Sequence, residues 1–160
     1  MCSMKIGILS DSHDNLIKIE KAVKFFNNKK VAFVLHAGDF IAPFTIIKLK
    51  ALDCEWKGVF GNNDGEKSGL SRVSEGKIKK GPVIIRLDNK KIILVHDINS
   101  INPNSVDADC VVFGHTHRPG IIKHKKKLLV NPGECGGWLT DKSTIALLDL
   151  NSLAARIFEI

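Results

Sequence analysis

The sequence lacks any long apolar run, and this absence excludes a membrane-spanning protein. No segment approaches the ~20 consecutive apolar residues that a transmembrane helix needs. The first residues, Met1-Cys2-Ser3-Met4-Lys5, also lack the apolar stretch and the small-residue cleavage site of a signal peptide. We therefore expect a cytoplasmic protein with no membrane partner.

Cysteine and aromatic residues are also scarce. The four cysteines, at positions 2, 54, 110 and 135, form no Cys-x-x-Cys pair, so a zinc ribbon or a thioredoxin-like motif is unsupported. A disulfide framework is not expected in a cytosolic chain. Cys54 and Cys110 lie beside apolar runs and are expected to be small core residues. With 6% aromatic residues and no tyrosine, a stacking platform for single-stranded nucleic acid is poorly supplied.

The formal net charge is +7 at pH 7, which suits an anionic substrate or nucleic acid. Much of the excess lies in one short stretch that contains Lys123, Lys125, Lys126 and Lys127. A solvated hairpin turn is the simpler interpretation of this stretch. Nucleic acid is therefore not an expected partner.

The length of 160 residues suits one domain, 1–160, and no repeat or linker divides it. In the first half, apolar strands at 5–9, 31–35 and 56–60 alternate with two helices, one with apolar residues on one face from Leu16 to Phe26 and one from Pro43 to about Leu52. The second half is mostly strands, and the residues between 65 and 82 read as a loop. The predicted strands there are 83–87, 92–95, 110–113, 121–122, 128–130, 145–150 and 155–160. We predict an α/β fold with two sheets and helices outside.

Polar residues that can bind metals follow five of these strands. In open α/β folds, ligands bind at the carboxyl ends of the strands, and five such ends are hard to ascribe to chance. The candidate metal ligands are Asp11, His13, Asp39, Asn62, His96, His115 and His117.

Two of the motifs combine donors of different chemistry. Asp11-Ser12-His13 directs a carboxylate and an imidazole the same way, a pair that suits Mn, Fe, Zn, Co or Ni. His115-Thr116-His117 delivers two imidazoles from one turn, although two surface histidines would look the same. Gly61-Asn62-Asn63-Asp64-Gly65 also reads as an ordinary turn. Together the set is complete for two ions ~3.5–4 Å apart, and Asp39 is the natural bridging ligand.

The order Asp-x-His, Gly-Asp, Gly-Asn-x-Asp, His, Gly-His-x-His resembles the calcineurin-like metallophosphoesterases, and within them the small single-domain phosphodiesterases. The resemblance covers essentially the whole chain, including Asn131-Pro132-Gly133. It implies a four-layer sandwich of two mixed sheets flanked by helices. It also implies hydrolysis of a small phosphate ester by a metal-bridging hydroxide, with two divalent ions such as Mn or Ni. One ion would be held by Asp11, His13, Asp39 and His117, and the other by Asp39, Asn62, His96 and His115.

Two departures from the family pattern affect catalysis. Asn63 stands where the family has a histidine that contacts the phosphate, and an amide donates a hydrogen bond but no proton. The His-Gly-His motif is replaced by His96-Asp97-Ile98. General acid catalysis contributes ~10²–10⁴-fold, so we predict a preference for activated leaving groups, or help from a proton source on the substrate or on a bound metal. Asp64 is expected to support the metal ligands from behind.

Other polar residues and functions stay open. His36 reads as a satisfied buried histidine or as support for the site, His124 as an exposed residue of the lysine turn, and Arg118 as a surface residue or a phosphate contact. The main alternative is a non-catalytic protein-binding scaffold of the same fold. A nuclease, a single-metal hydrolase and a homodimer are also considered.

Overall fold

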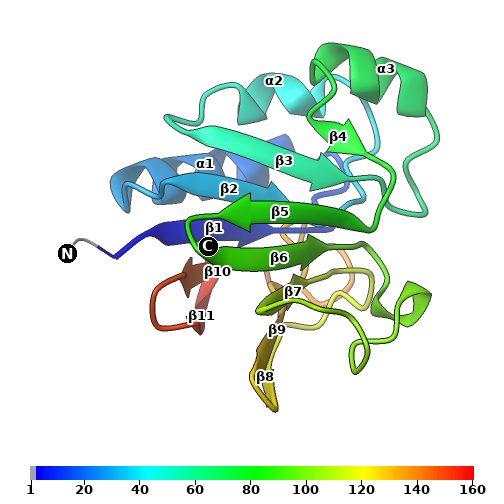
Figure 1. The fold of residues 1–160 in the computed structure, drawn as a ribbon. Helices are drawn as coiled ribbons and strands as arrows, with labels where there is room; N and C mark the ends of the chain where they lie inside the picture. Colours follow the sequence, from blue (N-terminus) through cyan, green and yellow to red (C-terminus); the bar gives the residue numbers. More distant parts are fainter. Residues whose placement is uncertain (1–2) are drawn as a thin grey trace.

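The structure is a computed structural model that describes residues 3–160, and two β-sheets form its centre (Figure 1). The first sheet has six strands in the order β11-β10-β1-β2-β3-β4. Its strands are β1 (Lys5–Leu9), β2 (Phe33–His36), β3 (Glu55–Val59), β4 (Ile78–Lys79), β10 (Thr144–Asp149) and β11 (Ala154–Glu159). The second sheet has five strands in the order β5-β6-β7-β9-β8. Its strands are β5 (Val83–Leu87), β6 (Lys90–Leu94), β7 (Cys110–Val112), β8 (Gly120–His124) and β9 (Lys127–Asn131).

Both sheets are mixed. In the first sheet β1, β2, β3 and β4 are parallel, while β10 and β11 are antiparallel additions. In the second, β6, β7 and β9 are parallel, while β5 and β8 pair antiparallel at the two edges. In Figure 1 the arrowheads of β2, β3 and β6 point to the same end of the molecule. The predicted α/β class with two mixed sheets is confirmed.

The main hydrophobic core lies between the two sheets. It joins Ile6 and Ile8 of β1 to Leu94 of β6 and Val112 of β7, all fully buried. Four of the five β1 residues are buried, which is typical of a strand covered on both faces and explains its unbroken apolar sequence.

The outer face of the first sheet is covered by helices α1 (Leu16–Asn28) and α2 (Thr45–Leu49). The buried residues of α1 are Ile19, Ala22, Val23 and Phe26, which share one helical face as predicted. Asn15 caps this helix, because its side chain accepts the Lys18 amide at 3.3 Å.

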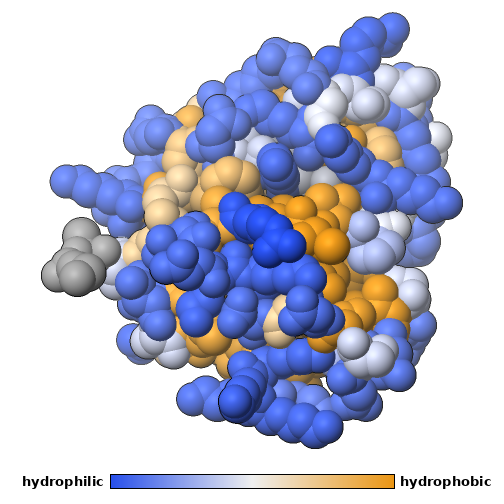
Figure 2. Space-filling model, viewed as in Figure 1, coloured by the Kyte–Doolittle hydropathy of each residue, from blue (hydrophilic) through white to orange (hydrophobic). Residues whose placement is uncertain are grey.

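The second sheet has a different cover. Residues 97–109, including a 3₁₀ turn at Ile98–Ser100, pack Ile98, Ile101 and Val106 against its outer face. Among the described residues, no helix is both long and apolar enough to cross a membrane. Figure 2 shows hydrophobic residues gathered over β5 and β6, and Ile84 on the edge strand β5 is 56% exposed. The exposed edge strand β5 is a surface through which the homodimer considered above could form.

Three details differ from the sequence prediction. The residues between 65 and 82 contain helix α3 (Lys67–Val73) and strand β4; this helix has a central glycine and only two buried residues, so it carries no apolar periodicity. Helix α2 is shorter than predicted at both ends. Cys110 is a core residue as predicted, Cys54 is only half-buried, and Cys2 lies outside the described residues.

Candidate functional site: a metal centre at the strand ends

The structure brings together all seven residues that the sequence singled out, although they come from both sheets. Backbone hydrogen bonds connect the loops that carry them. The Asp11 amide donates to Gly38 O at 2.9 Å, the His13 amide to Asp39 O at 3.1 Å, and the Gly114 amide to His96 O at 2.9 Å. The His115 amide donates to Asp11 Oδ2 at 3.1 Å. The side chains are therefore held on one connected framework.

Five of the seven residues have a left-handed backbone. Their φ angles are 50° for Asp11, 42° for His13, 60° for Asp39, 68° for His115 and 60° for His117. Residues other than glycine rarely adopt this conformation, and it costs free energy. Such residues cluster where function requires a particular side-chain direction, and here all five direct their side chains to the same place.

Two of the three glycines that directly precede predicted ligands, Gly38 and Gly61, illustrate a steric role. Gly38 has a φ of 104°, and a Cβ there would lie 2.6 Å from His96 Nδ1. A Cβ on Gly61 would collide with the carboxylate of Asp39. Both positions therefore need glycine because polar side chains of the site pass directly over the backbone.

Four of the residues form a compact group. One donor atom from each of Asp11, His13, Asp39 and His117 lies within 4.8 Å of the others. His13 Nε2 lies 3.4 Å from Asp39 Oδ2, and His117 Nε2 lies 3.5 Å from Asp11 Oδ1. Asp11 Oδ1 and His13 Nε2 are buried and have no hydrogen-bond partner among the described residues. Such orphaned atoms are costly unless something binds them, and a carboxylate and an imidazole together fit a divalent cation.

The other residues gather around Asn62. His96 Nδ1 lies 2.7 Å from Ala37 O, and a carbonyl only accepts, so Nδ1 carries the proton. The lone pair of His96 Nε2 then lies 2.8 Å from Asn62 Oδ1, a second acceptor. His115 Nδ1 lies 3.0 Å from the same oxygen. A cation, or rotation of the Asn62 amide to present its NH2 group, would satisfy the two facing acceptors. Asp39 Oδ2 is 3.6 Å from His96 Nε2 and so lies between the two groups.

Comparison with known proteins identifies the class. Residues 4–153 match the family model of the calcineurin-like phosphoesterase superfamily domain. The chain belongs to this superfamily. The predicted resemblance is thus confirmed, and with it the enzyme class of hydrolases that act on phosphate esters.

Individual relatives agree with this assignment. The phosphoesterase is 37% identical over 154 residues to a phosphodiesterase from Methanocaldococcus jannaschii, covering 91% of this chain and 93% of the relative. Its fold matches the solved structure of an archaeal phosphodiesterase with a TM-score of 0.92 and 34% identity, covering 98% of this chain and 100% of that one. Zinc-bound Vps29 from Entamoeba histolytica matches with a TM-score of 0.71, 20% identity and 98% coverage of both chains, which shows a shared fold alone.

The sequence analysis of this phosphoesterase missed Glu134. This residue is fully buried, and its Oε2 lies 2.9 Å from His117 Nδ1. The contact fixes the proton on Nδ1 and leaves the Nε2 lone pair facing Asp11, as in carboxylate–histidine–metal arrangements. Burial opposes ionisation of Glu134, but its hydrogen bonds with His117 and Thr140 outweigh burial and lower its pKa. The available signal was an acidic residue directly after the Asn-Pro-Gly motif.

The pKa values of the two aspartates of the site are shifted in opposite directions. Burial opposes ionisation of Asp39, but the His13 imidazole 3.4 Å away and hydrogen bonds from the Asn63 backbone and side chain hold its pKa well below the usual range. Burial raises the pKa of Asp11, and Ser10 and nearby histidines offset only part of this effect. The nearby carboxylate of Asp39 raises the pKa of His13.

Two predicted auxiliary residues contact Asp39 directly. Asn63 donates its backbone N–H to Asp39 Oδ1 at 2.9 Å and its side-chain amide to Asp39 Oδ2 at 2.8 Å. Asp64 is buried and accepts the amides of Asp39, Ile41 and Gly61 at 3.1, 2.8 and 2.8 Å. Asp64 therefore orders the backbone behind the site.

The remaining polar residues have simpler surroundings. His36 is fully buried; its Nδ1 accepts the Gly38 amide at 3.1 Å, and its Nε2 lies 2.9 Å from Ser12 Oγ. Burial lowers the pKa of His36 to about 3, so it is a neutral, satisfied histidine that also supports the loop between Asp11 and His13. Arg118 is exposed, and His124 is half-buried rather than exposed as predicted.

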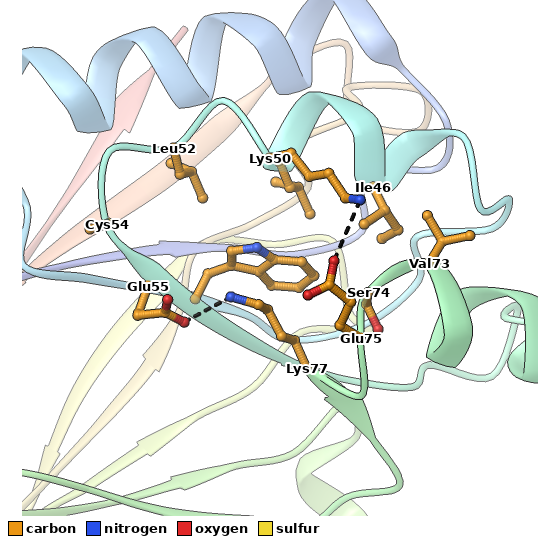
Figure 3. A pocket seen from close by; sticks show the side chains of 11 residues that line it. Ile46, Lys50, Leu52, Cys54, Glu55, Val73, Ser74, Glu75 and Lys77 are labelled. Carbon is orange, nitrogen blue, oxygen red and sulfur yellow. Dashed lines mark hydrogen bonds and ion pairs between the residues drawn. The ribbon is translucent and has the colours of Figure 1, made fainter.

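Three cavities are relevant to the location of the chemistry. One of about 320 Å³ borders His13 and His117, and another of about 370 Å³ borders Asn62 and His96. A third, of about 350 Å³, lies between α2, β3 and the end of α3, and its lining includes the ion pairs Lys50–Glu75 at 3.8 Å and Lys77–Glu55 at 2.8 Å (Figure 3). None of the seven candidate ligands lines the third cavity, so we place the chemistry at the first two.

Proposed function

We propose that this phosphoesterase is a two-metal phosphodiesterase that hydrolyses small phosphate diesters. The position of Asp39 carries the proposal, because its Oδ2 lies 3.4 Å from His13 Nε2 and 3.6 Å from His96 Nε2. A carboxylate between two imidazoles suits a ligand shared by two divalent ions. The relatives described as phosphodiesterases support the preference for diesters.

The seven residues divide into two ligand sets that share Asp39. One ion would be held by Asp11, His13, Asp39 and His117, and the other by Asp39, Asn62, His96 and His115. Mixed carboxylate, amide and imidazole donors suit Mn²⁺ or Ni²⁺, and Fe, Zn and Co accept the same donors. When bound, the two ions supply activation of a water nucleophile and neutralise charge on the phosphoryl group.

The protein prepares these donors before any ion or substrate arrives. Ala37 O and Glu134 fix the protons of His96 and His117 on Nδ1, so both Nε2 lone pairs already face the site. Asn63 lies beside Asp39 and can donate a hydrogen bond to a phosphate oxygen but no proton to the leaving group. The best substrates should therefore have leaving groups that depart without protonation.

A panel of metals and substrates tests the proposal. The purified chain, loaded with Mn²⁺ or Ni²⁺, is assayed with bis(4-nitrophenyl) phosphate, 4-nitrophenyl phosphate and a cyclic nucleotide, with Asp39→Ala as the blank. We expect the aryl diester to be the best substrate and elemental analysis to find two ions per chain. If the folded, metal-loaded chain cleaves none of the esters, the proposal is wrong, and one ion per chain would refute its two-metal part.

Other readings of the fold make different predictions. For a protein-binding scaffold, Asp11→Ala and His115→Ala would leave function intact. A nuclease would bind duplex DNA with strong salt dependence.

We also propose a cytoplasmic location, which the free thiols of Cys54, Cys110 and Cys135 support. A homodimer stays a prediction, which sedimentation velocity of the purified chain checks.

A further inference from the structure

Two large apolar side chains lie exposed beside the candidate metal centre. Trp138 is 63% exposed and Leu139 is 74% exposed. Both line the cavity of about 320 Å³ that also borders His13, His117, Asn63 and Ile41. A single exposed apolar residue is ordinary. Here an indole and a leucine are both exposed next to the proposed ligands of one ion, where a substrate of the metal centre would bind.

The backbone that carries Trp138 is fixed against the loop that carries Asp11 and His13. The Trp138 Nε1–H donates to His13 O at 3.2 Å, which fixes one edge of the indole. The Gly136 amide donates to Asp11 O at 3.1 Å, and Asn15 Nδ2 donates to Gly136 O at 2.7 Å. The indole is thus positioned before substrate binds, which reduces the entropic cost of stacking on it.

Leu139 is positioned through the residue that orients His117. Its backbone amide donates to Glu134 Oε1 at 2.9 Å, while Glu134 Oε2 contacts His117 Nδ1 at 2.9 Å. The buried carboxylate of Glu134 therefore positions both His117, a proposed metal ligand, and Leu139, which lines the adjoining cavity.

The charged residues around this cavity restrict the kind of chemical group that can bind in it. No lysine or arginine from residues 3–160 lines it, and its one carboxylate, on Asp14, already accepts the Ala42 amide at 3.0 Å and the Thr45 hydroxyl at 2.6 Å. By contrast, the cavity of about 370 Å³ on the Asn62 and His96 side is lined by two lysines, Lys67 and Lys80, against one carboxylate, that of Asp97. An anionic group is favoured on the lysine side and an uncharged flat group on the Trp138 side.

We infer that Trp138 and Leu139 form a specificity surface that stacks an aromatic ring of the phosphate diester, such as an aryl group or a nucleobase. The inference rests on the proposed phosphodiesterase function and adds a class of substrate to it. The ring would lie against the indole while the phosphoryl group lies at the seven candidate ligands.

Matched esters test the role of the ring. Ethyl phenyl phosphate and ethyl hexafluoroisopropyl phosphate have leaving groups of similar acidity, but only the first carries a ring. We expect Trp138→Ala to lower kcat/KM for the phenyl ester by ~5-fold or more, the lower end for loss of a stacking aromatic, and to change the ring-free ester little. Trp138→Phe should retain most of the activity. The control is Ile47→Ala, since Ile47 is also 63% exposed but does not line the cavity.

Fluorescence gives a second measurement that does not depend on turnover. The chain has two tryptophans, and Trp56 is only 4% exposed. With Mn²⁺ present, adenosine 5′-monophosphate should quench the emission of the wild-type protein and not that of Trp138→Phe, while ribose 5-phosphate should quench neither.

The possible outcomes separate the two proposals. If wild-type protein hydrolyses neither ester and no other diester, the phosphodiesterase function is refuted. If it hydrolyses both and Trp138→Ala changes both equally or not at all, the stacking surface is refuted and the phosphodiesterase function stands. Equal quenching by the two phosphates would also overturn the stacking surface.

Discussion

The two halves of the candidate metal centre differ in how firmly they are held. In the half formed by Asp11, His13, Asp39 and His117, both aspartates are almost completely buried, and Glu134 supports a histidine from behind. In the half formed by Asn62, His96 and His115 around Asp39, two donors are imidazoles, one is an amide, and His115 is exposed.

This difference predicts an order of binding. Two carboxylates attract a divalent cation more strongly than one carboxylate and a neutral amide. Orphaned atoms such as Asp11 Oδ1 and His13 Nε2 lose no existing hydrogen bond when an ion binds. Asn62 Oδ1, in contrast, already lies within hydrogen-bond distance of His115 Nδ1, at 3.0 Å. We therefore expect the ion of the buried half to bind more tightly than the ion of the Asn62 half.

The largest effect should come from the residue that both halves share. Asp39→Ala removes a ligand from each ion, so we expect phosphodiesterase activity to fall by more than the ~10³-fold that loss of one stabilising group costs. Elemental analysis should find that neither ion is retained. Asp53→Ala, at an exposed aspartate, is the control. Full retention of one ion would show that Asp39 is not shared.

Removing one ligand from each half should separate the two binding events. Isothermal titration of the metal-free protein should show a tight and a weaker event. We expect Asp11→Ala to lose the tight event and His115→Ala to lose the weaker one, each by at least the ~10–100-fold that loss of a mere supporting group costs. If the two variants lose the same event, the proposed division into halves is wrong.

The support from Glu134 should matter for the buried half alone. Glu134→Gln keeps the shape of the side chain but removes the negative charge beside His117, so the affinity of the tight event should fall by ~10–100-fold while the weaker event changes little. The exposed Glu159→Gln is the matched control. An unchanged tight event would contradict the role given to Glu134.

The smallest expected effect concerns the free energy of unfolding at acid pH. His36 has its pKa lowered from 6.5 to about 3 by burial, so between these values the unfolded chain binds a proton that the folded chain does not. The stabilising contribution of neutral His36 is complete above pH 6.5 and is lost as the pH falls toward 3, by at most ~1.4 kcal/mol per pH unit. Urea unfolding between pH 7 and 5 should show a steeper loss for wild type than for His36→Gln. Equal slopes would contradict this account.

Much of the fold was predictable because strands and site motifs obey local rules. The apolar runs at 5–9 and 83–87 became β1 and β5 with the same bounds. Helix α3 was not predictable, since only Gly69 and Leu70 are buried in it and its formation depends on tertiary contacts. The packing of residues 97–109 over the second sheet was not predictable either, because it also depends on tertiary contacts.

That the seven residues lie together was predictable from the sequence, and so was the support from Asp64, but the places of Glu134 and Trp138 were not. Asp11, Asp39 and His117 follow apolar strands and carry donor chemistry, which is visible in the sequence. Glu134 acts through His117, and Trp138 through its place beside His13; neither relation leaves a local pattern, because both depend on loops that meet only after folding. The metal-ligand roles of the seven residues stay predictions.

The left-handed backbone of five candidate ligands has a consequence for how the chain tolerates change. A residue such as His117, with a φ of 60°, costs the folded state free energy that glycine would not. Glycine at these positions would relieve the backbone strain, but it would also remove the hydrogen bonds that Asp11, Asp39 and His117 make with His115, Asn63 and Glu134. Backbone strain and donor position are therefore coupled in this site, because the same loops that aim the side chains at one place also hold the strain.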